Sequence, residues 1–438
     1  MKFRNIISII IFFLAVQIAI GQVQRPNIVL IMADDMGYEA LGCNGSLSYS
    51  TPHLDNLANR GIRFTNCFSQ PLCTPSRVKL MTGKYNFRNY EDFGYLNPKE
   101  RTIGNLMKDA GYITCISGKW QLNGLNRNNK DNQDVYRPFD FGFDEYCLWQ
   151  VHHARSEGER YANPQITKNG RDLPRNEDAY GPELFCDFIV DFIDKYSKQP
   201  FFIYYPMVLV HDPFVPTPDL AEWSVKSIRY ENDTAYFKDM VAYTDKIVHR
   251  IELKLKEAGV WENTIFIFTA DNGTHPSITT KTIYGDVQGG KGLSINTGNH
   301  VPMIATWPAV NQRRGVYNGI IGFEDFFPTL ANAAGVGPNQ FDNDGTSFLR
   351  AIAGSTEPIQ SEIFIHYSPR WGENKHNRWV MDGSYKLYQD GRFFNTLIDP
   401  LEEYPLMVLS DNQKGIKQRF KQILTEKENE FPFRLNDQ

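Results

Sequence analysis

The stretch Pro26–Asp35, PNIVLIMADD, decides the fold class of this chain. Ile28 to Met32 form a continuous apolar run, which is the pattern of a β-strand buried on both of its faces. Strands of this kind belong to parallel sheets, because the helices that connect parallel strands cover both faces of the sheet. The run stops at Asp34-Asp35, so this strand is expected to carry two carboxylates at its carboxyl end.

Helical and strand patterns alternate from this stretch to about residue 335. Thr51-Pro52 has the residues of a helix start, and Gly61 and Gly259 follow stretches with helical apolar spacing. Helices are therefore expected at 51–61, 102–111, 182–198 and 234–258, and further strands at 201–210, 264–269 and 301–307. The alternation predicts an α/β fold with a large mixed, mostly parallel sheet flanked by helices.

After about residue 340 the pattern changes to short strand candidates separated by turns such as Asp382-Gly383 and Asp390-Gly391. The candidates lie at 363–366, 379–381, 385–388 and 392–395, and a last helix is expected at 413–430. This pattern predicts a smaller C-terminal antiparallel-sheet subdomain. The chain is thus divided into a main α/β domain over residues 25–335 and an α+β subdomain over residues 340–438.

The first 21 residues have the features of a secretory signal peptide. Lys2 and Arg4 precede an apolar run from Ile6 to Ile20, and Gly21 supplies a small residue at the cleavage region. The run has about 15 residues, whereas a membrane span needs about 20. We therefore expect an exported protein, periplasmic or secreted, with no membrane span in the mature chain.

Charge and cysteine content restrict the function further. Without Lys2 and Arg4, 44 basic residues face 51 acidic ones, a balance that argues against nucleic acid as a partner. The six cysteines have no CxxC spacing typical of zinc sites, and in an exported chain they are compatible with three disulfides. If one cysteine is used chemically, at least one other stays unpaired.

Oxygen-bearing side chains follow two of the expected strands. Asp34-Asp35 ends the first strand, and Asp271-Asn272 ends the strand at 264–269. Ligands gather at the carboxyl ends of strands in open α/β sheets, so these four side chains are expected to meet at one edge. Three carboxylates and an amide form a hard oxygen site that favours Ca²⁺ or Mg²⁺ over zinc. Each pair alone is better explained as a turn, and only together do they favour a metal.

The pentapeptide Cys73-Thr74-Pro75-Ser76-Arg77 resembles the signature Cys-x-Pro-Ser-Arg of the formylglycine-dependent sulfatases, which belong to the alkaline phosphatase superfamily. The continuation Val78–Lys84, VKLMTGK, is also similar to the family pattern. The resemblance implies that a maturation enzyme oxidises Cys73 to formylglycine, whose hydrated form attacks sulfur and then releases sulfate by elimination. It also implies one Ca²⁺, with Mg²⁺ less suitable, held by Asp34, Asp35, Cys73, Asp271 and Asn272. The alternative is a buried structural cysteine before a Pro-Ser turn.

Three further segments resemble the family in chain order. Gly118-Lys119-Trp120 implies a sulfate contact for Lys119, Gly289-Gly290-Lys291-Gly292 implies a second for Lys291, and His211 in HDPFVPTP is implied to protonate the leaving alcohol. Arg77 is implied to hold the diol and the metal-ligand oxygens. Taken alone, these residues are compatible with surface lysines, a glycine loop and a loop histidine.

The chain departs from the family pattern after Lys119, where Gln121 stands in place of the usual His. Glutamine cannot accept a proton near neutral pH, so His275 is considered as a substitute. The segment Asn296–Pro302 also differs from the family continuation.

Two loop regions with basic and aromatic residues are candidates for a sugar subsite, although ordinary solvated loops have the same composition. Their residues are His152, His153 and Arg155 in the first, and Arg370, Trp371, His376 and Arg378 in the second. The expected substrate is a sulfated carbohydrate. The alternatives are a phosphate or phosphonate monoester hydrolase of the same superfamily and a non-catalytic glycan-binding homologue.

Overall fold

The structure is a computed structural model that describes residues 25–125, 130–152, 160–311, 313–337 and 340–432. The predicted signal peptide at residues 1–21 lies outside these ranges. Within them, no helix combines the length and the apolar character that crossing a membrane requires.

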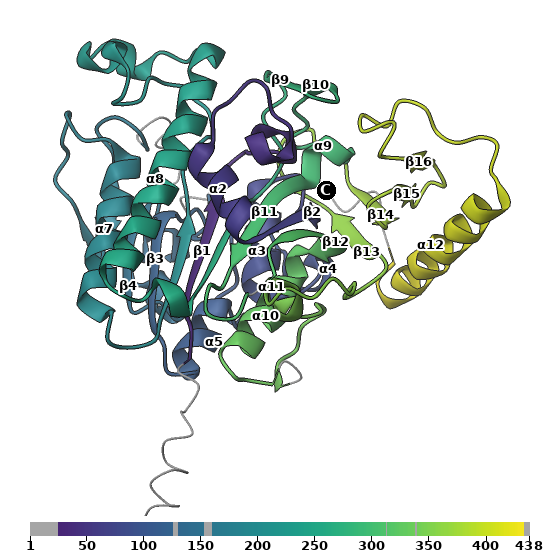
Figure 1. Cartoon of the computed structure of the whole chain (residues 1–438), viewed down its shortest axis with the longest axis horizontal. Helices are drawn as coiled ribbons and strands as arrows, with labels where there is room; N and C mark the ends of the chain where they lie inside the picture. Colours follow the sequence, from purple (N-terminus) through teal and green to yellow (C-terminus); the bar gives the residue numbers. More distant parts are fainter. Residues whose placement is uncertain (1–24, 126–129, 153–159, 312, 338–339, 433–438) are drawn as a thin grey trace, which may run out of the picture.

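A central mixed sheet of ten strands forms the main body (Figure 1), in the order β12-β2-β11-β8-β1-β7-β3-β4-β5-β6. Neighbouring strands from β8 to β4 run parallel, as do β12 and β2, and the other neighbours are antiparallel. The strands are β1 (Asn27–Ala33), β2 (Ile62–Phe68), β3 (Ile113–Lys119), β4 (Glu145–Trp149), β5 (Ile166–Lys168), β6 (Arg171–Asp172), β7 (Phe201–Pro206), β8 (Thr264–Ala270), β11 (His300–Thr306) and β12 (Gly315–Gly322). A separate hairpin joins β9 (Thr279–Thr282) and β10 (Gly285–Gln288).

Two groups of helices cover the sheet (Figure 1). In one group, α8 (Phe237–Glu257) packs against both α2 (Pro52–Arg60) and α7 (Gly181–Tyr196), and α7 lies against β3. The other group contains α3 (Cys73–Thr82), α5 (Ile103–Asp109) and α10 (Phe326–Ala333), with α5 against β3. Every residue of β1 is buried between them, as the apolar run at 28–32 predicts. The predicted α/β architecture is confirmed.

The C-terminal part is an antiparallel sheet with one long helix (Figure 1). Its elements are β13 (Ile363–Tyr367), β14 (Asn377–Met381), β15 (Tyr385–Tyr388), β16 (Phe393–Asn395) and α12 (Asp411–Glu430). Phe420 and Leu424 of α12 pack on one face of this sheet. Residues of the other face, among them Trp379 and Met381, share an apolar cluster with Cys73, so the subdomain supports the region around this cysteine.

Three details differ from the expectations. The strand expected at 201–210 ends at Pro206, although the following residues stay beside β1, where Met207 N donates to Met32 O at 2.8 Å. The stretch after Leu72, which is not among the expected helices, forms a helix that begins at Cys73, since Pro75 is tolerated in a first turn and Ser76 Oγ donates to Leu72 O. All six cysteines are free thiols, so the three disulfides are not formed.

Candidate active site

The two acidic pairs leave the sheet side by side. β1 and β8 are parallel neighbours, and Ala33 pairs with Ala270 in their register. The Asp35 amide donates to Asp271 Oδ1 at 3.1 Å, and Asn272 Nδ2 donates to Asp35 Oδ1 at 2.9 Å. All four side chains of Asp34, Asp35, Asp271 and Asn272 are fully buried. The structure therefore brings together the residues that the sequence predicts at one edge of the sheet.

This carboxylate cluster requires positive charge. Burial and the nearby Asp34 carboxylate raise the pKa of Asp271 to about 7. Burial alone would raise the pKa of Asp34 too, but the charges of Lys119, His211 and Arg77 outweigh it and lower this pKa. Three carboxylates at such short range are stable together only when cations compensate them.

Three cationic side chains approach the cluster from separate elements. Lys119, the last residue of β3, donates to both Asp34 carboxylate oxygens at 2.9 and 3.0 Å. Arg77 on α3 donates from Nη2 to Asp271 Oδ2 at 2.9 Å and lies 3.5 Å from Asp34 Oδ1. Lys291 donates to Asp35 Oδ2, and the charge of this carboxylate, opposed by burial, raises the pKa of Lys291.

Cys73 is the first residue of α3 and is only 2% exposed. Its Sγ lies 3.9 Å from Gln121 Oε1, so the residue in place of the family histidine faces the sulfur. Burial raises the pKa of the Cys73 thiol. The thiolate is disfavoured here, and the unmodified side chain is a poor nucleophile near neutral pH.

His211 lies in the segment after β7 and faces the cluster with one ring nitrogen. Its Nε2 is 3.0 Å from Lys291 Nζ and 3.7 Å from Asp35 Oδ2, while Nδ1 is 2.9 Å from Asp212 Oδ1. Burial lowers the pKa of His211. The segment is anchored to β1, since the Asp34 amide donates to Leu209 O at 2.7 Å.

The side chains present fit a hard divalent cation. Asn272 Oδ1 is buried and has no hydrogen-bond partner among the described residues, which is the state expected for an oxygen that serves as a metal ligand. Asp34, Asp35 and His211 also offer atoms within 4.8 Å of one another. Carboxylate and amide oxygens suit Ca²⁺ better than an imidazole does, so the set with Asp271 and Asn272 is the better one.

A cavity of about 810 Å³ opens above these residues. Cys73, Gln121, His211 and Lys291 lie in its wall. Trp371 at the rim is 50% exposed and stacks on Phe93 with ring centroids 4.5 Å apart. The remaining lining residues are Leu72, Leu125, Trp149, Gln150, Arg160, Asp212, Pro213, Val215, Arg229, Tyr230 and Asn232.

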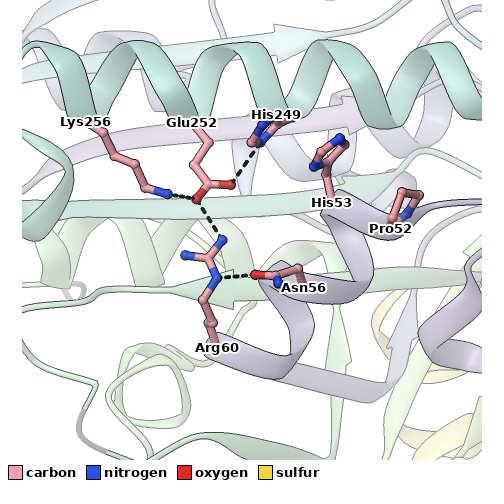
Figure 2. A pocket seen from close by; sticks show the side chains of 7 residues that line it. All are labelled: Pro52, His53, Asn56, Arg60, His249, Glu252 and Lys256. Atoms are coloured by element: carbon pink, nitrogen blue, oxygen red, sulfur yellow. Dashed lines mark hydrogen bonds and ion pairs between the residues drawn. The ribbon is translucent and has the colours of Figure 1, made fainter.

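A second polar pocket, of about 470 Å³, lies between α2 and α8 (Figure 2). Its charged groups point toward one another: Arg60 Nη2 donates to Glu252 Oε1 at 2.7 Å, and Lys256 donates to the same oxygen. His53 and His249 stack in parallel, with ring centroids 3.7 Å apart. Because the charges of this pocket pair internally, it is a weaker candidate for an active site.

The model of the sulfatase family matches residues 26–336, which include every residue predicted for catalysis or metal binding. The chain belongs to the sulfatase family. This sulfatase is 27% identical over 472 residues to N-acetylgalactosamine-6-sulfatase of Mus musculus, with 93% of this chain and 87% of the relative covered.

Solved structures share the fold of this sulfatase. The complex of BT4656 with its substrate D-glucosamine-2-N,6-O-disulfate has a TM-score of 0.73 at 19% identity, covering 93% of this chain and 98% of the other. Phosphonate monoester hydrolase of Agrobacterium radiobacter has a TM-score of 0.68 at 18% identity, covering 93% and 96%. The fold alone therefore does not separate sulfate from phosphonate esters.

Most of the loop residues considered for a sugar subsite are engaged elsewhere in this sulfatase. His152 lies 2.8 Å from Asp172, Arg370 donates to Glu91 O, and Arg378 donates to Phe431 O. His376 lies 3.1 Å from Ser368 Oγ. Of the described candidates, Trp371 is the one that lines the cavity. His153 and Arg155 lie outside the described residues.

Two further positions complete the comparison with the sequence. His275 is not among the residues that line the cavity, and its Nδ1 lies 2.8 Å from Ser277 Oγ, so it does not replace the family histidine. Arg160 lines the cavity 3.9 Å from Asp34 Oδ2, yet no motif indicates it. A polar segment with several charges gives no signal that one of them turns inward.

Proposed function

We propose that this sulfatase removes sulfate from carbohydrate esters with a formylglycine made from Cys73 and one Ca²⁺. The observation that carries the proposal is the convergence of three carboxylates and an unpaired amide oxygen beside a buried cysteine whose thiolate is disfavoured. Formylglycine would supply a hydrated aldehyde, with one hydroxyl for attack on sulfur and a second for elimination of sulfate. Bound Ca²⁺ would supply positive charge beside it, held by Asp34, Asp35, Asp271, Asn272 and the modified Cys73.

The positions of the remaining site residues support the roles that we propose for them. Lys119 and Lys291 bind sulfate oxygens and stabilise the charge that develops there. Arg77 keeps the Asp271 and Asp34 oxygens in place through its guanidinium contacts. Asp212 orients the His211 ring through Nδ1, and Nε2 accepts from Lys291. When Lys291 turns to the sulfate, Nε2 would be free to take up the proton that the leaving alcohol needs.

A carbohydrate substrate is supported by the rim of the cavity. Trp371 presents an exposed aromatic face stacked on Phe93, and such faces suit sugar rings. The rim residue comes from the C-terminal part, so we propose a catalytic domain over residues 25–335 whose cavity is completed by the subdomain at 340–438. The mouse relative is an N-acetylgalactosamine-6-sulfatase by name, which agrees with this substrate class.

Maturation and export are parts of the same proposal. Residues 1–21 direct export to the periplasm or the medium. Cys73 is buried on a helix whose ten residues are all buried, so we expect the maturation enzyme to act on it before the chain has folded.

The test is turnover of 4-nitrophenyl sulfate by the mature protein and by a Cys73→Ala variant, together with peptide mass spectrometry at residue 73. We expect a loss of about 10⁴-fold or more in kcat for the variant, because the nucleophile is removed. The variant should keep its circular dichroism spectrum. Unchanged activity of Cys73→Ala, or an unmodified thiol in fully active protein, contradicts the mechanism.

A parallel assay with 4-nitrophenyl phosphate tests the phosphate-hydrolase alternative, which the fold shared with a phosphonate monoester hydrolase keeps relevant. We expect kcat/KM to be higher for the sulfate. A higher value for the phosphate would assign the site to the other ester class.

A further inference from the structure

Arg160 is a buried cation without an acceptor in the wall of the cavity. It is 6% exposed, and its Nε and Nη1 atoms have no hydrogen-bond partner among the described residues. The shortest ion-pair distance of Arg160 is 3.9 Å, from Nη1 to Asp34 Oδ2. Asp34 is too far away to accept a hydrogen bond from Arg160, and a buried guanidinium whose N–H groups lack acceptors is unfavourable unless another acceptor, such as an anion, satisfies them.

The position of Arg160 is fixed by its surroundings. Its guanidinium stacks over the Trp149 ring at 4.2 Å. The next residue, Tyr161, donates its hydroxyl to Val208 O at 2.8 Å and to His211 O, so the backbone of this segment is tied to the segment that carries His211. A Cβ at position 181 would lie 1.9 Å from Arg160 O, so Gly181 allows the close packing that holds Arg160 in place.

Arg229 in the same wall provides a contrast. It also stacks on a tryptophan, Trp223, at 4.4 Å. However, its Nε donates to Trp223 O and its Nη1 donates to Glu177 O at 2.5 and 2.7 Å. Arg229 thus has acceptors within the protein, and Arg160 is the arginine of this wall whose donors remain available.

The charge balance of the cavity indicates what Arg160 binds. Four cationic side chains and four carboxylates gather around its floor: Arg77, Lys119, Arg160 and Lys291, and Asp34, Asp35, Asp212 and Asp271. These formal charges cancel, so the proposed Ca²⁺ leaves two positive charges, and a sulfate monoester neutralises one of them. A substrate with one more anionic group completes the balance.

We propose that Arg160 binds a second anionic group, a sulfate or a carboxylate, on the same sugar substrate that carries the reacting sulfate ester. The inference rests on the proposed function, because the charge count includes the metal and places the reacting ester beside Lys119 and Lys291. A planar guanidinium presents pairs of N–H donors, Nη1 with Nη2 at its end or Nε with Nη2 at its side, that match two oxygens of either group.

The experiment compares matched substrates in the mature holoenzyme. The substrates are N-acetylglucosamine 6-sulfate beside N-sulfoglucosamine 6-sulfate, and N-acetylgalactosamine 6-sulfate beside its 4,6-disulfate and its β1,3-linked glucuronate disaccharide. The last arm separates a carboxylate from a sulfate. Where a sugar is not turned over, its inhibition constant against 4-nitrophenyl sulfate is measured instead.

The variants are Arg160→Met, which keeps an apolar stem against Trp149, and Arg160→Lys, which keeps the charge. For at least one pair, we expect wild type to prefer the doubly anionic sugar and Arg160→Met to reduce this preference by about 10- to 100-fold. Arg160→Lys should retain part of it. Arg160→Met should lose more activity on the doubly anionic sugar than on its singly anionic partner or on 4-nitrophenyl sulfate, and the ratio of these losses is the readout.

Two results overturn the inference while the proposed function stands. One is wild-type sulfatase activity with no preference for any doubly anionic sugar. The other is an equal loss on singly and doubly charged substrates in Arg160→Met at an unchanged melting temperature, which would place Arg160 on the reacting sulfate. If wild type does not hydrolyse any of these esters, the proposed function fails, and calorimetric binding of the same sugar pairs still decides the role of Arg160.

Discussion

The cavity at the ends of β1 and β8 and the pocket between α2 and α8 are both lined by charged side chains, yet their charges behave differently. In the α2–α8 pocket, Glu252 accepts hydrogen bonds from Arg60 and Lys256, so the pocket neutralises itself (Figure 2). In the other cavity, carboxylates crowd one another, and Asn272 Oδ1 and Arg160 keep atoms without a partner. Self-pairing stabilises a fold, whereas unpaired buried groups indicate a ligand.

Removal of calcium should have the largest effect, and it should act on the cavity at the ends of β1 and β8 but not on the α2–α8 pocket. With excess EGTA we expect kcat/KM on 4-nitrophenyl sulfate to fall by about 10³-fold or more, because charge stabilisation at the reacting group is lost. Unfolding free energy should fall as well, by about 2.7 kcal/mol relative to protein at a hundredfold excess of Ca²⁺ over its Kd.

Added Ca²⁺ should restore both quantities, and Mg²⁺ should restore less of them. The Asp271→Ala variant should no longer respond to either ion, whereas Glu252→Gln should respond like wild type. Full activity after exhaustive chelation, verified by metal analysis, would exclude a required metal.

Lys119→Met is expected to have the next largest effect. Lys119 is the last residue of β3, and its side chain donates to both oxygens of Asp34. In the proposed reaction it stabilises charge on the sulfate. We expect kcat to fall by about 10²- to 10³-fold, as for the loss of one preorganised donor. Kinetics on 4-nitrophenyl sulfate measure this.

The matched control for Lys119 is Lys256→Met in the α2–α8 pocket. That lysine also donates to a buried carboxylate, but we expect kcat/KM to stay within about twofold of wild type, as for a substitution away from the reacting groups. Comparable losses in the two variants would remove the distinction between the pockets.

Gln121→His adds a titratable group beside Cys73 and so tests the chemistry of the active-site cavity. The Gln121 backbone has φ of 52°, a left-handed conformation in which histidine is also found. We expect kcat to rise by up to about tenfold near neutral pH, because an imidazole can take the proton in the elimination step. Gln121→Asn, which cannot take this proton, is the control, and a gain in both variants would contradict the explanation.

The sequence predicts the fold and the centre of this site because both depend on local patterns. A strand buried on both faces is visible in the sequence as an apolar run. Asp34 and Asp271 directly follow two such runs. Cys73 and the lysines lie in short motifs, so they are visible without a structure. Their roles as ligands and catalysts stay predictions, which the experiments above test.

The outer parts of the site escape sequence reasoning because they depend on contacts between distant segments. Arg160 faces the cavity only because Trp149 and Gly181 hold it there, and no local pattern reports these contacts. His152 and Arg370 have suitable chemistry, but Asp172 and a backbone carbonyl engage them. Composition therefore selects candidate residues for a subsite, and the packing decides among them.

The smallest predicted effect concerns stability alone. Glu252 is 3% exposed in the α2–α8 pocket and accepts hydrogen bonds from two cations. Burial alone would raise the pKa of Glu252, but the hydrogen bonds from Lys256 and Arg60 outweigh it, so the pKa is lowered. Glu252→Gln should lower the unfolding free energy at pH 7 by about 1 to 3 kcal/mol, with kcat/KM unchanged.

The direction of the pH dependence distinguishes this ion pair from a packing effect. Because the folded-state pKa lies below the ordinary value of 4.5, the contribution of Glu252 is present above that pH and is lost as pH falls through the folded-state pKa. Urea unfolding at pH 7 and pH 4 should therefore show a smaller difference between wild type and Glu252→Gln at the lower pH. Glu257→Gln, on an exposed carboxylate of the same helix region, should differ from wild type by less than about 0.5 kcal/mol at both values. A pH-independent loss in Glu252→Gln would mean that its shape, and not its charge, stabilises the α2–α8 contact.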